Sequence, residues 1–313
     1  MNYWLIGAGE MAINYAKVLQ ALGISFEVIG RGESSANNFS KVTSIIPKTG
    51  GVSAALKDGT VPDAAIIAVC IDQLSETATT LIEAGTRHIL IEKPGGLNLE
   101  EIYQLNEIAL QYGTVVWLAY NRRFYASILK AEELIADDGG ASSLNFEFTE
   151  WSHKICNLSM APGVKENWFL GNSTHVVDLA FYLCGVPAEW KCWHAGSLDW
   201  HPAAARYCGA GMTDRGVLFS YMADWDAPGR WGLEVLTRKR RFIMRPMENL
   251  QITMLGSVQL ESVELDDKLD HDFKPGLYRQ TAAFINNEDS RFCTLSQQVS
   301  NVGLYVKMGG YKS

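Results

Sequence analysis

The sequence predicts an α/β protein in which a doubly wound parallel sheet precedes a second α/β domain with a large, mostly antiparallel open sheet. Short apolar runs alternate with helical segments over the first 120 residues, which is the pattern of a parallel sheet with helical crossovers. Further along, strand-like runs follow one another through short links, which indicates antiparallel neighbours. We therefore expect two domains, residues 1–121 and 122–313.

The composition is that of a globular protein without a broad affinity for polyanions. The 313 residues are 47% hydrophobic and 20% charged, and the formal net charge is -8. This charge argues against nucleic acid or an anionic membrane as a partner. The six cysteines show no zinc-type spacing, so we expect no metal and reduced thiols in a cytoplasmic protein. No signal peptide is evident, and no apolar run approaches the ~20 residues of a membrane span.

The first element is a strand, Tyr3–Ile6, that runs into the sequence Gly7-Ala8-Gly9-Glu10-Met11-Ala12 and then a helix. This G-x-G-x-x-A fingerprint lies between two strands, the second being Ser25–Ile29, and predicts a Rossmann dinucleotide-binding domain. The helix N-terminus adds partial positive charge for a pyrophosphate. A tight turn without a ligand is the alternative. The cofactor-binding residues expected in this loop are Gly7, Gly9, Glu10, Met11 and Ala12.

The end of the second strand indicates which dinucleotide binds. Gly30 stands where NAD enzymes usually carry an acidic residue, and Arg31 follows it. A guanidinium binds phosphate with paired hydrogen bonds, and Ser34 and Ser35 lie within reach. These residues favour NADP through its 2′-phosphate. NAD is the alternative, with Arg31 solvated and Glu33 at the ribose.

The remaining elements of the first domain continue the alternation. Besides a buried strand that ends at Ile91, four are expected: a strand Asp63–Cys70, with Cys70 at the cofactor; a helix Ser75–Ala84; a helix Leu99–Tyr112; and a strand Thr114–Ala119. Between the two helices, the apolar residues 89–91 precede Glu92-Lys93-Pro94-Gly95-Gly96. The carboxyl ends of strands in such sheets are where ligands bind, so a lysine held there by proline is a candidate for chemistry. A surface lysine is the alternative.

Three stretches together resemble one family. The glycine fingerprint, then Glu92-Lys93-Pro94, then Tyr120-Asn121-Arg122-Arg123-Phe124, are similar in order and spacing to the glucose–fructose oxidoreductase / inositol dehydrogenase / MocA family. The resemblance implies a Rossmann domain, a second domain with a mostly antiparallel sheet, and hydride transfer between NAD or NADP and a carbon of a sugar, polyol or related compound. It also implies that Lys93 lies by the nicotinamide and the reacting hydroxyl, and that the Lys93–Pro94 peptide is a candidate for cis.

A lysine in that place suits the chemistry. Like-charge repulsion from an oxidised nicotinamide favours the neutral amine, which can exchange a proton with the reacting oxygen or hydrogen-bond it. Pro94 fixes the backbone, and Glu92 is expected to hold the turn or the cofactor side. Glu92, Lys93 and Pro94 are therefore also expected among the cofactor-binding residues.

The second domain is expected to contain a helix Tyr125–Ala136 and then mainly strands. The strands expected are Leu144–Thr149, Trp190–Ala195, Gly216–Trp225, Gly232–Thr237, Arg241–Arg245, Leu250–Leu255 and Val258–Leu265. Helices Tyr278–Asn286 and Ser296–Met308 should end the chain. In the family, the open face of this sheet often mediates assembly, which implies a homodimer or homotetramer.

The stretch Leu170–Gly185 contains the main candidate catalytic residue of the second domain. Asn172 or Ser173 is expected to cap a helix with His175 in its first turn and Asp178 on the same face. The family pattern D-x-x-x-H implies that His175 lies near the substrate, but Gly171 stands at the aspartate position. A capping or core histidine is the alternative.

The residues expected to bind a small carbohydrate-like substrate are Lys93, Tyr120, Asn121, Arg122, Trp168, Asn172 and His175, with Lys93 and His175 catalytic. Seven of the nine tryptophans fall in the second domain, where core packing is the simpler explanation for each except Trp168. His153 and Lys154 sit where a substrate loop is plausible. The basic run 238–241 is most simply a charged hairpin link, with a phosphate site as the alternative.

The function these patterns favour is an NADP-preferring oxidoreductase acting on a sugar, sugar nucleotide or cyclic polyol. Two alternatives stay open. The departure at Gly171 motivates a non-catalytic dinucleotide-binding sensor or assembly subunit. Relatives implied by the resemblance also include enzymes that use the cofactor transiently or reduce a non-sugar.

Overall fold

The computed structural model describes residues 1–311, which form two compact units. The first unit comprises Met1–Asn121 and Leu269–Val302, and the second comprises Arg122–Lys268 and the residues from Gly303 onward. The sequence pattern predicts a single boundary, after residue 121. The structure differs in one respect: the segment 269–302 returns to the first unit.

The first unit is the expected doubly wound sheet. Its strands are β1 (Tyr3–Ile6), β2 (Phe26–Ile29), β3 (Ala64–Ile67), β4 (His88–Ile91), β5 (Val115–Leu118) and β14 (Cys293–Thr294). Within the described residues these six strands run in the order β14-β5-β4-β3-β1-β2, and β1 to β5 pair in parallel. The carboxyl ends of β2, β1, β3 and β4 therefore follow one another along one edge of the sheet.

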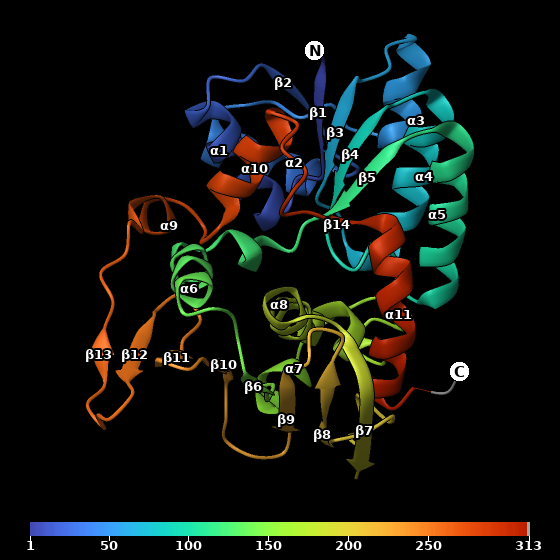
Figure 1. Cartoon of the computed structure of the whole chain (residues 1–313). Coiled ribbons are helices and arrows are strands. Elements are labelled where there is room, and N and C mark those ends of the chain that lie inside the picture. Colours follow the sequence, from blue (N-terminus) through green and yellow to red (C-terminus); the bar gives the residue numbers. More distant parts are fainter. Residues whose placement is uncertain (312–313) are drawn as a thin grey trace. The chain divides into compact units, whose positions relative to one another are not determined.

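Helices cover both faces of this sheet (Figure 1). They are α1 (Glu10–Ala21), α2 (Glu33–Thr43), α3 (Val52–Ala55), α4 (Leu74–Ala84), α5 (Leu99–Tyr112) and α10 (Leu277–Ile285). Two further helices, α9 (Lys268–Asp272) and α11 (Leu295–Gly309), each include residues of both units. Figure 1 draws α3, α4 and α5 on one side and α1, α2 and α10 on the other. Because both faces are covered, the strands are nearly continuous apolar runs, and β3 is buried at every position.

The returning segment is held by aromatic packing and by β14. Cys293 and Thr294 pair with β5 in antiparallel fashion, which adds an edge strand to the parallel sheet. Trp117 of β5 stacks on Phe292 with ring centroids 4.5 Å apart, and Phe284 of α10 meets the same indole edge-on at 6.0 Å. Stacked and edge-on aromatic pairs add stability beyond the area they bury, which explains why this segment joins the first unit.

The second unit is built on a large sheet. Its strands are β6 (Ser143–Phe148), β7 (Pro187–Ala195), β8 (Arg206–Thr213), β9 (Leu218–Asp224), β10 (Trp231–Leu236), β11 (Arg240–Met244), β12 (Gln251–Met254) and β13 (Glu261–Ser262). These eight strands of the described chain run in the order β13-β12-β11-β10-β6-β9-β8-β7. All neighbours are antiparallel except β6 and β9, so the predicted mostly antiparallel sheet is confirmed.

Three helices accompany this sheet: α6 (Ala126–Asp137), α7 (Ser152–Ile155) and α8 (Thr174–Cys184). Helix α8 packs on β6 and β10 and covers the inner face with aromatic side chains. Phe146 of β6, for example, meets Phe181 of α8 edge-on at 5.5 Å. Within residues 1–311, no helix combines the length and apolar character that crossing a membrane requires.

The structure corrects several details of the expected elements. Strand β8 and helix α2 were not anticipated. The strand predicted over Val258–Leu265 is wrong in extent, because only Glu261 and Ser262 pair with β12. This segment lies at the sheet edge and Val258 is fully exposed, so little packing favours a longer strand. The helix predicted over Leu99–Tyr112 has those bounds.

Candidate functional site

A cleft of about 640 Å³ lies in the first unit at the carboxyl ends of β1, β2 and β3. The fingerprint loop lines it, together with the chain after β2 and after β3. Of the predicted cofactor residues, the cleft is lined by Gly7, Gly9, Glu10, Met11, Arg31, Ser35 and Cys70. Ala12 lies behind it, fully buried between helix α1 and the sheet, and Ser34 is exposed in the first turn of α2.

The two glycines of the fingerprint serve different purposes. Gly7 has φ +120°, and a Cβ there would lie 2.3 Å from the carbonyl oxygen of Ala68 in the next strand connection. It is therefore required by the fold itself. A Cβ on Gly9 would meet no described atom within 4 Å. Space is kept open in front of Gly9, as close approach of a ligand requires.

Helix α1 begins at this open space. Gly9 is its N-cap, and the described structure shows no side chain capping the N–H groups of the first turn. Uncapped N–H groups at the start of a 12-residue helix form a ready site for a phosphate. The geometry therefore fits a dinucleotide pyrophosphate at the fingerprint loop.

Arg31 and the start of α2 lie at the other end of the cleft. Gly32 is the N-cap of α2, again without a side-chain cap in the described structure, and Ser35 donates a 3.0 Å hydrogen bond to the Gly32 carbonyl. Arg31 is exposed. A guanidinium beside a helix N-terminus suits an anion. Glu33, in the first turn of the same helix, is an opposing charge.

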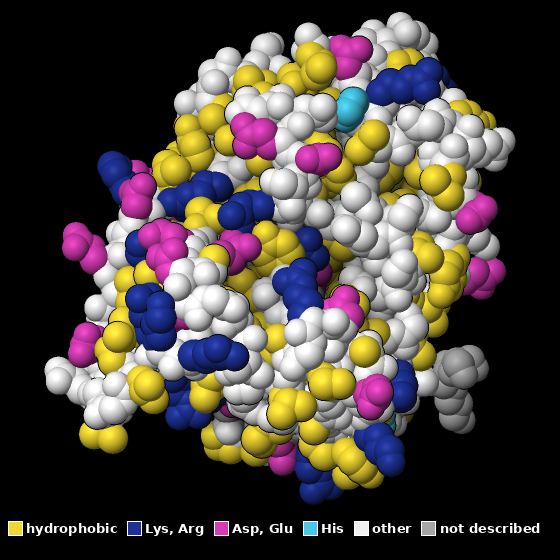
Figure 2. Space-filling view, viewed as in Figure 1, with side chains coloured by type: hydrophobic (Ala, Val, Ile, Leu, Met, Phe, Trp, Pro, Cys, Tyr) yellow, Lys and Arg dark blue, Asp and Glu magenta, His cyan; other side chains and the backbone are white. Residues whose placement is uncertain are grey.

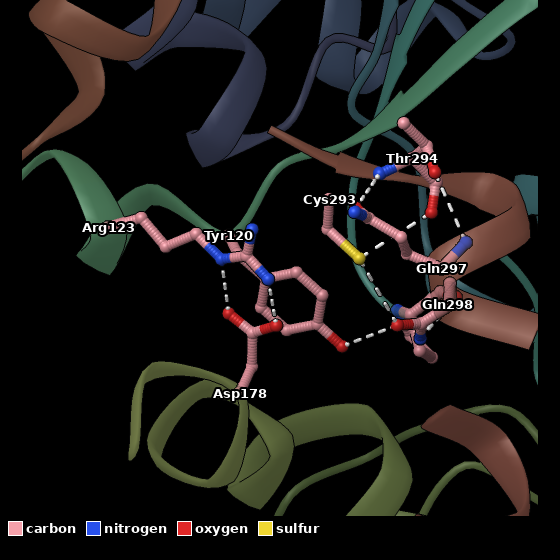
Figure 3. Close-up of polar contacts among 8 residues, drawn as sticks. Tyr120, Arg123, Asp178, Cys293, Thr294, Gln297 and Gln298 are labelled. Carbon is pink, nitrogen blue, oxygen red and sulfur yellow. Dashed lines mark hydrogen bonds and ion pairs between the residues drawn. The ribbon is translucent and has the colours of Figure 1, made fainter. Parts of the chain in front are cut away.

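The Glu92-Lys93-Pro94 segment follows β4, the strand beside β3. The Lys93–Pro94 peptide is cis, as the resemblance implied. Gln298 of α11 donates to the Pro94 carbonyl at 3.1 Å and accepts from the Tyr120 hydroxyl at 3.1 Å (Figure 3). Lys93 itself is half-buried. The segment that carries Lys93 is thus fixed by side chains of its own unit.

Glu92 is held from the opposite side. Its carboxylate accepts a 2.9 Å hydrogen bond from the Tyr15 hydroxyl of α1. Burial raises the pKa of the Glu92 carboxyl, while Lys93 and the Tyr15 hydrogen bond oppose that shift. Burial and the nearby Glu92 charge likewise raise the pKa of Tyr15 well above its ordinary value. Glu92 therefore links helix α1 of the dinucleotide cleft to the lysine.

Two predicted substrate residues of the first unit make internal contacts. The Tyr120 side chain is buried, with its hydroxyl on Gln298. Asn121 is also buried and donates to the Pro275 carbonyl at 2.9 Å, just before α10. Both residues thus help to hold the returning segment in place.

The second unit contains its own cavity, of about 360 Å³, at the carboxyl end of β6. Arg122 and Trp168, both predicted to bind substrate, line it. Residues that sequence reasoning did not single out complete the wall, chiefly Glu150, Trp151, Arg230 and Trp231. Glu150 follows the alternating pattern of β6 directly, and a polar residue at that strand end is the signal that could have found it.

Asn172 and His175 lie directly behind this wall. Asn172 donates to both carboxylate oxygens of Glu150, at 3.0 and 3.1 Å, and Ser173 donates to one of them at 2.7 Å. The His175 ring lies 6.2 Å from the ring of Trp231. The structure thus brings Arg122, Trp168, Asn172 and His175 together within the second unit.

One expectation about the start of α8 is corrected. No side-chain cap is present, because the π-helical segment Phe169–Ser173 leads into α8 and Ser173 gives its hydroxyl to Glu150. Asp178 lies three residues after His175 in α8, as expected, and has a partner that the sequence did not indicate. Its carboxylate binds the Arg123 guanidinium through two hydrogen bonds, at 2.8 and 2.5 Å, and both side chains are buried (Figure 3). Asp178 is therefore committed to an internal ion pair.

No group of three or more His, Cys, Asp and Glu side chains in residues 1–311 is arranged to hold a metal ion. The described residues also form a third hollow, of about 560 Å³, in the second unit, and the predicted His153 lines it together with Glu150 and Trp151.

Comparisons with known proteins agree with this description. Residues 1–120 match the Gfo/Idh/MocA family, described as an oxidoreductase family with an NAD-binding Rossmann fold. No curated protein matches the chain.

Solved structures resemble nearly the whole chain. UDP-N-acetylglucosamine 3-dehydrogenase GnnA from Acidithiobacillus ferrooxidans is 17% identical, with a TM-score of 0.76 over 99% of this chain and 97% of that one. An NAD-binding oxidoreductase from Klebsiella pneumoniae is 16% identical, with a TM-score of 0.77 over 98% of this chain and 96% of that one. A levoglucosan dehydrogenase solved with NADH is 16% identical, with a TM-score of 0.79 over 99% of this chain and 96% of that one. At these identities the likeness establishes the shared fold.

Proposed function

We propose that this chain, whose residues 1–120 belong to the Gfo/Idh/MocA oxidoreductase family and form its NAD-binding Rossmann domain, transfers a hydride to or from a carbon of a sugar, sugar nucleotide or cyclic polyol. The observation that carries the proposal is the order of the strand ends. Arg31, Gly9 and Lys93 follow β2, β1 and β4, which lie along one edge of the sheet. With strands ~4.8 Å apart, that edge spans about 14 Å from β2 to β4 and suits an extended dinucleotide.

The roles follow from this order. The bound NAD(P) supplies or accepts the hydride. Lys93, at the β4 end, exchanges the proton of the reacting oxygen or hydrogen-bonds it, and the fixed Glu92 and Pro94 hold its backbone in position. His175 is the second group proposed for the same oxygen. UDP-N-acetylglucosamine 3-dehydrogenase and levoglucosan dehydrogenase, which share the fold, act on carbohydrates by name, which supports a carbohydrate-like substrate here.

NADP is the proposed preference. Arg31 lies beside the uncapped N-terminus of α2, and both features favour a 2′-phosphate. Titration with NADPH and NADH, followed by energy transfer from tryptophan to the nicotinamide, tests this. Arg31→Ala should weaken NADPH binding about tenfold or more and NADH binding much less, since a charge-assisted contact is lost.

Lys41→Ala is the matched control, because it removes an exposed positive charge from the last turn of the same helix α2. Equal loss in both variants, or tighter binding of NADH than NADPH by the unmodified protein, would refute the preference and point to Glu33 at the ribose. Failure of both dinucleotides to bind would refute the oxidoreductase itself.

Catalysis is tested separately, once a substrate is found in a screen of sugars and polyols. Lys93→Met should lower kcat by about 10²–10⁴-fold while leaving NADPH binding unchanged, because it removes the proton-exchanging group. Unchanged kcat in this variant would exclude Lys93 from the chemistry. A protein that binds NADPH but turns over no carbonyl or alcohol would instead be a sensor.

We also propose a homo-oligomer formed through the outer face of the second sheet. In register on β7, β8 and β9, this face exposes Trp193 (59%), Met212 (37%), Leu218 (60%) and Met222 (53%). Large apolar side chains that gather in this way mark interaction surfaces. Light scattering should give a dimer or tetramer, and Leu218→Lys should shift it towards monomer. A monomeric unmodified protein would refute this assembly.

A further inference from the structure

The cavity of the second unit has the size of a small-ligand site. Its volume of about 360 Å³ lies near the lower end of the ~300–1,000 Å³ range of such sites. It therefore suits a single ring with one substituent better than a long ligand.

Aromatic faces form one part of its wall. Trp168 and Trp231 line it from two distant segments of the second unit. The Trp168 indole N–H is buried and has no hydrogen-bond partner among the described residues. Indole faces stack on apolar C–H surfaces, and a buried N–H gains from an acceptor on a ligand. This part of the cavity suits a ring that carries both an apolar C–H face and a hydrogen-bond acceptor.

Glu150 provides hydrogen-bond acceptors at the cavity wall. The side chain is buried, and Asn172 and Ser173 fix its orientation. These two donors make three hydrogen bonds to the carboxylate, which fixes an acidic group at this part of the wall.

Positive charge is the least expected feature of the cavity. Arg122, Lys154 and Arg230 line it, and none of the three forms an ion pair with a carboxylate in the described structure. Arg122 instead lies over the Trp231 ring at 4.6 Å, and Lys154 lies over the Trp151 ring at 4.3 Å. Against these three cations stand two carboxylates, Glu150 and Glu248, which leaves a positive balance in a chain of net charge -8.

Figure 2 shows Lys and Arg side chains on the surface with Asp and Glu side chains among them, so the three cations of the cavity without an ion pair are a local feature. Cations close together repel one another unless an anion lies between them, so an unpaired set at a cavity favours a negatively charged ligand.

We propose that this cavity binds a carbohydrate ring that carries one anionic substituent, a carboxylate or a phosphate. The tryptophans pack against the ring, and Arg122, Lys154 and Arg230 bind the anion. The inference rests on the proposed oxidoreductase function and narrows its substrate class to acidic or phosphorylated monosaccharides.

The test is calorimetric titration of the whole chain with matched sugars at low ionic strength. Each of the gluco, galacto and manno series is used as the neutral hexose, the hexuronate and the hexose 6-phosphate. At least one charged member should bind about tenfold or more tightly than its neutral parent, since charge-assisted hydrogen bonds are gained. Preference for the uronate or for the phosphate identifies which anion the site takes. Added salt should reduce the preference by screening.

Variants at exposed cavity residues test the assignment without disturbing the core. Lys154→Ala combined with Arg230→Ala should abolish most of the preference for the charged sugars. Arg238→Ala, which removes an exposed cation of the same unit outside the cavity, should leave it unchanged. A preference that survives the double variant would overturn the assignment.

Equal binding of charged and neutral sugars, or binding of none, would also overturn the proposal. Titration of the same preparation with NADPH separates this failure from the larger one. NADPH binding without any preference for charged sugars removes only this inference, whereas loss of NADPH binding removes the proposed function.

Discussion

The cleft of the first unit and the cavity of the second differ in what lines them. The cleft is formed largely by backbone and small residues of consecutive strand ends, such as Gly7, Gly9, Gly30 and Ala68. The cavity is formed by large side chains from well-separated segments, such as Arg122, Glu150, Trp168 and Trp231. The cleft presents backbone groups that suit the phosphates common to all dinucleotides. The shape of the cavity depends instead on which side chains line it.

This difference locates specificity. A backbone surface binds through N–H groups and helix ends that most substitutions leave intact. A side-chain surface changes with every substitution at its wall, so the proposed substrate specificity depends on the residues that line the cavity.

The side-chain-built region should be the more fragile of the two. Asp178→Ala is expected to destabilise the protein by about 3–5 kcal/mol, because it removes the carboxylate that the buried Arg123 guanidinium binds. Urea unfolding measures the loss. The matched control is Glu133→Ala, which breaks the exposed Lys130–Glu133 pair on α6 and should cost at most about 0.5 kcal/mol. Equal costs would show that the Arg123–Asp178 pair does not support α8.

Two glycines of the backbone-built cleft should differ in what their substitution changes, with Gly7 affecting stability and Gly9 affecting dinucleotide binding. Gly7→Ala is expected to cost about 2–4 kcal/mol, since the added Cβ would lie 2.3 Å from the Ala68 oxygen at a φ of +120°. Gly9→Ala should leave the melting temperature nearly unchanged, yet weaken NADPH binding, because its Cβ enters only the open space. Thermal melts and NADPH titration measure both. A Gly9 variant that loses stability but keeps its affinity would reverse these assignments.

The same contrast explains how far the sequence alone could lead. The fingerprint loop and helix α5 were predictable because each depends on a few consecutive residues, whereas the cis Lys93–Pro94 peptide was expected from the family resemblance. Strand β8 was missed because Gly209 and Gly211 weaken a strand pattern locally. A Cβ at those positions would collide with Tyr221 and Trp190 of the neighbouring strands, which no local pattern reveals.

Long-range packing accounts for the other differences. The segment 269–302 was placed with the second domain because it follows it in sequence, but the pairing of β14 with β5 and the stacking of Phe292 on Trp117 return it to the first unit. Asp178 has the spacing of a partner for His175, and only the fold brings Arg123 to it. Glu150 likewise became a candidate through its contacts with Asn172 and Ser173.

The smallest expected effect lies at Glu92, where the backbone cleft depends on one buried side chain. Because burial raises its pKa, the folded protein holds the Glu92 proton more tightly than the unfolded chain, whose pKa is about 4.3. This contribution to stability is fully present below about pH 4.3 and is lost as the pH rises through the folded-state pKa. The ionised Glu92 carboxylate therefore lowers the stability of the folded protein at neutral pH.

Glu92→Gln should remove that cost and keep an acceptor for the Tyr15 hydroxyl. We expect the variant to be more stable than the unmodified protein at pH 7–8 by roughly 1 kcal/mol or less, and the two to converge as the pH falls towards 4. Melting temperatures across that range measure the difference. Glu100→Gln, at an exposed carboxylate in the first turn of α5, is the control and should show no such trend. The opposite trend is a variant whose stability, relative to that of the unmodified protein, falls from pH 4 to pH 8. That result would mean that the Lys93 and Tyr15 contacts outweigh the burial of Glu92.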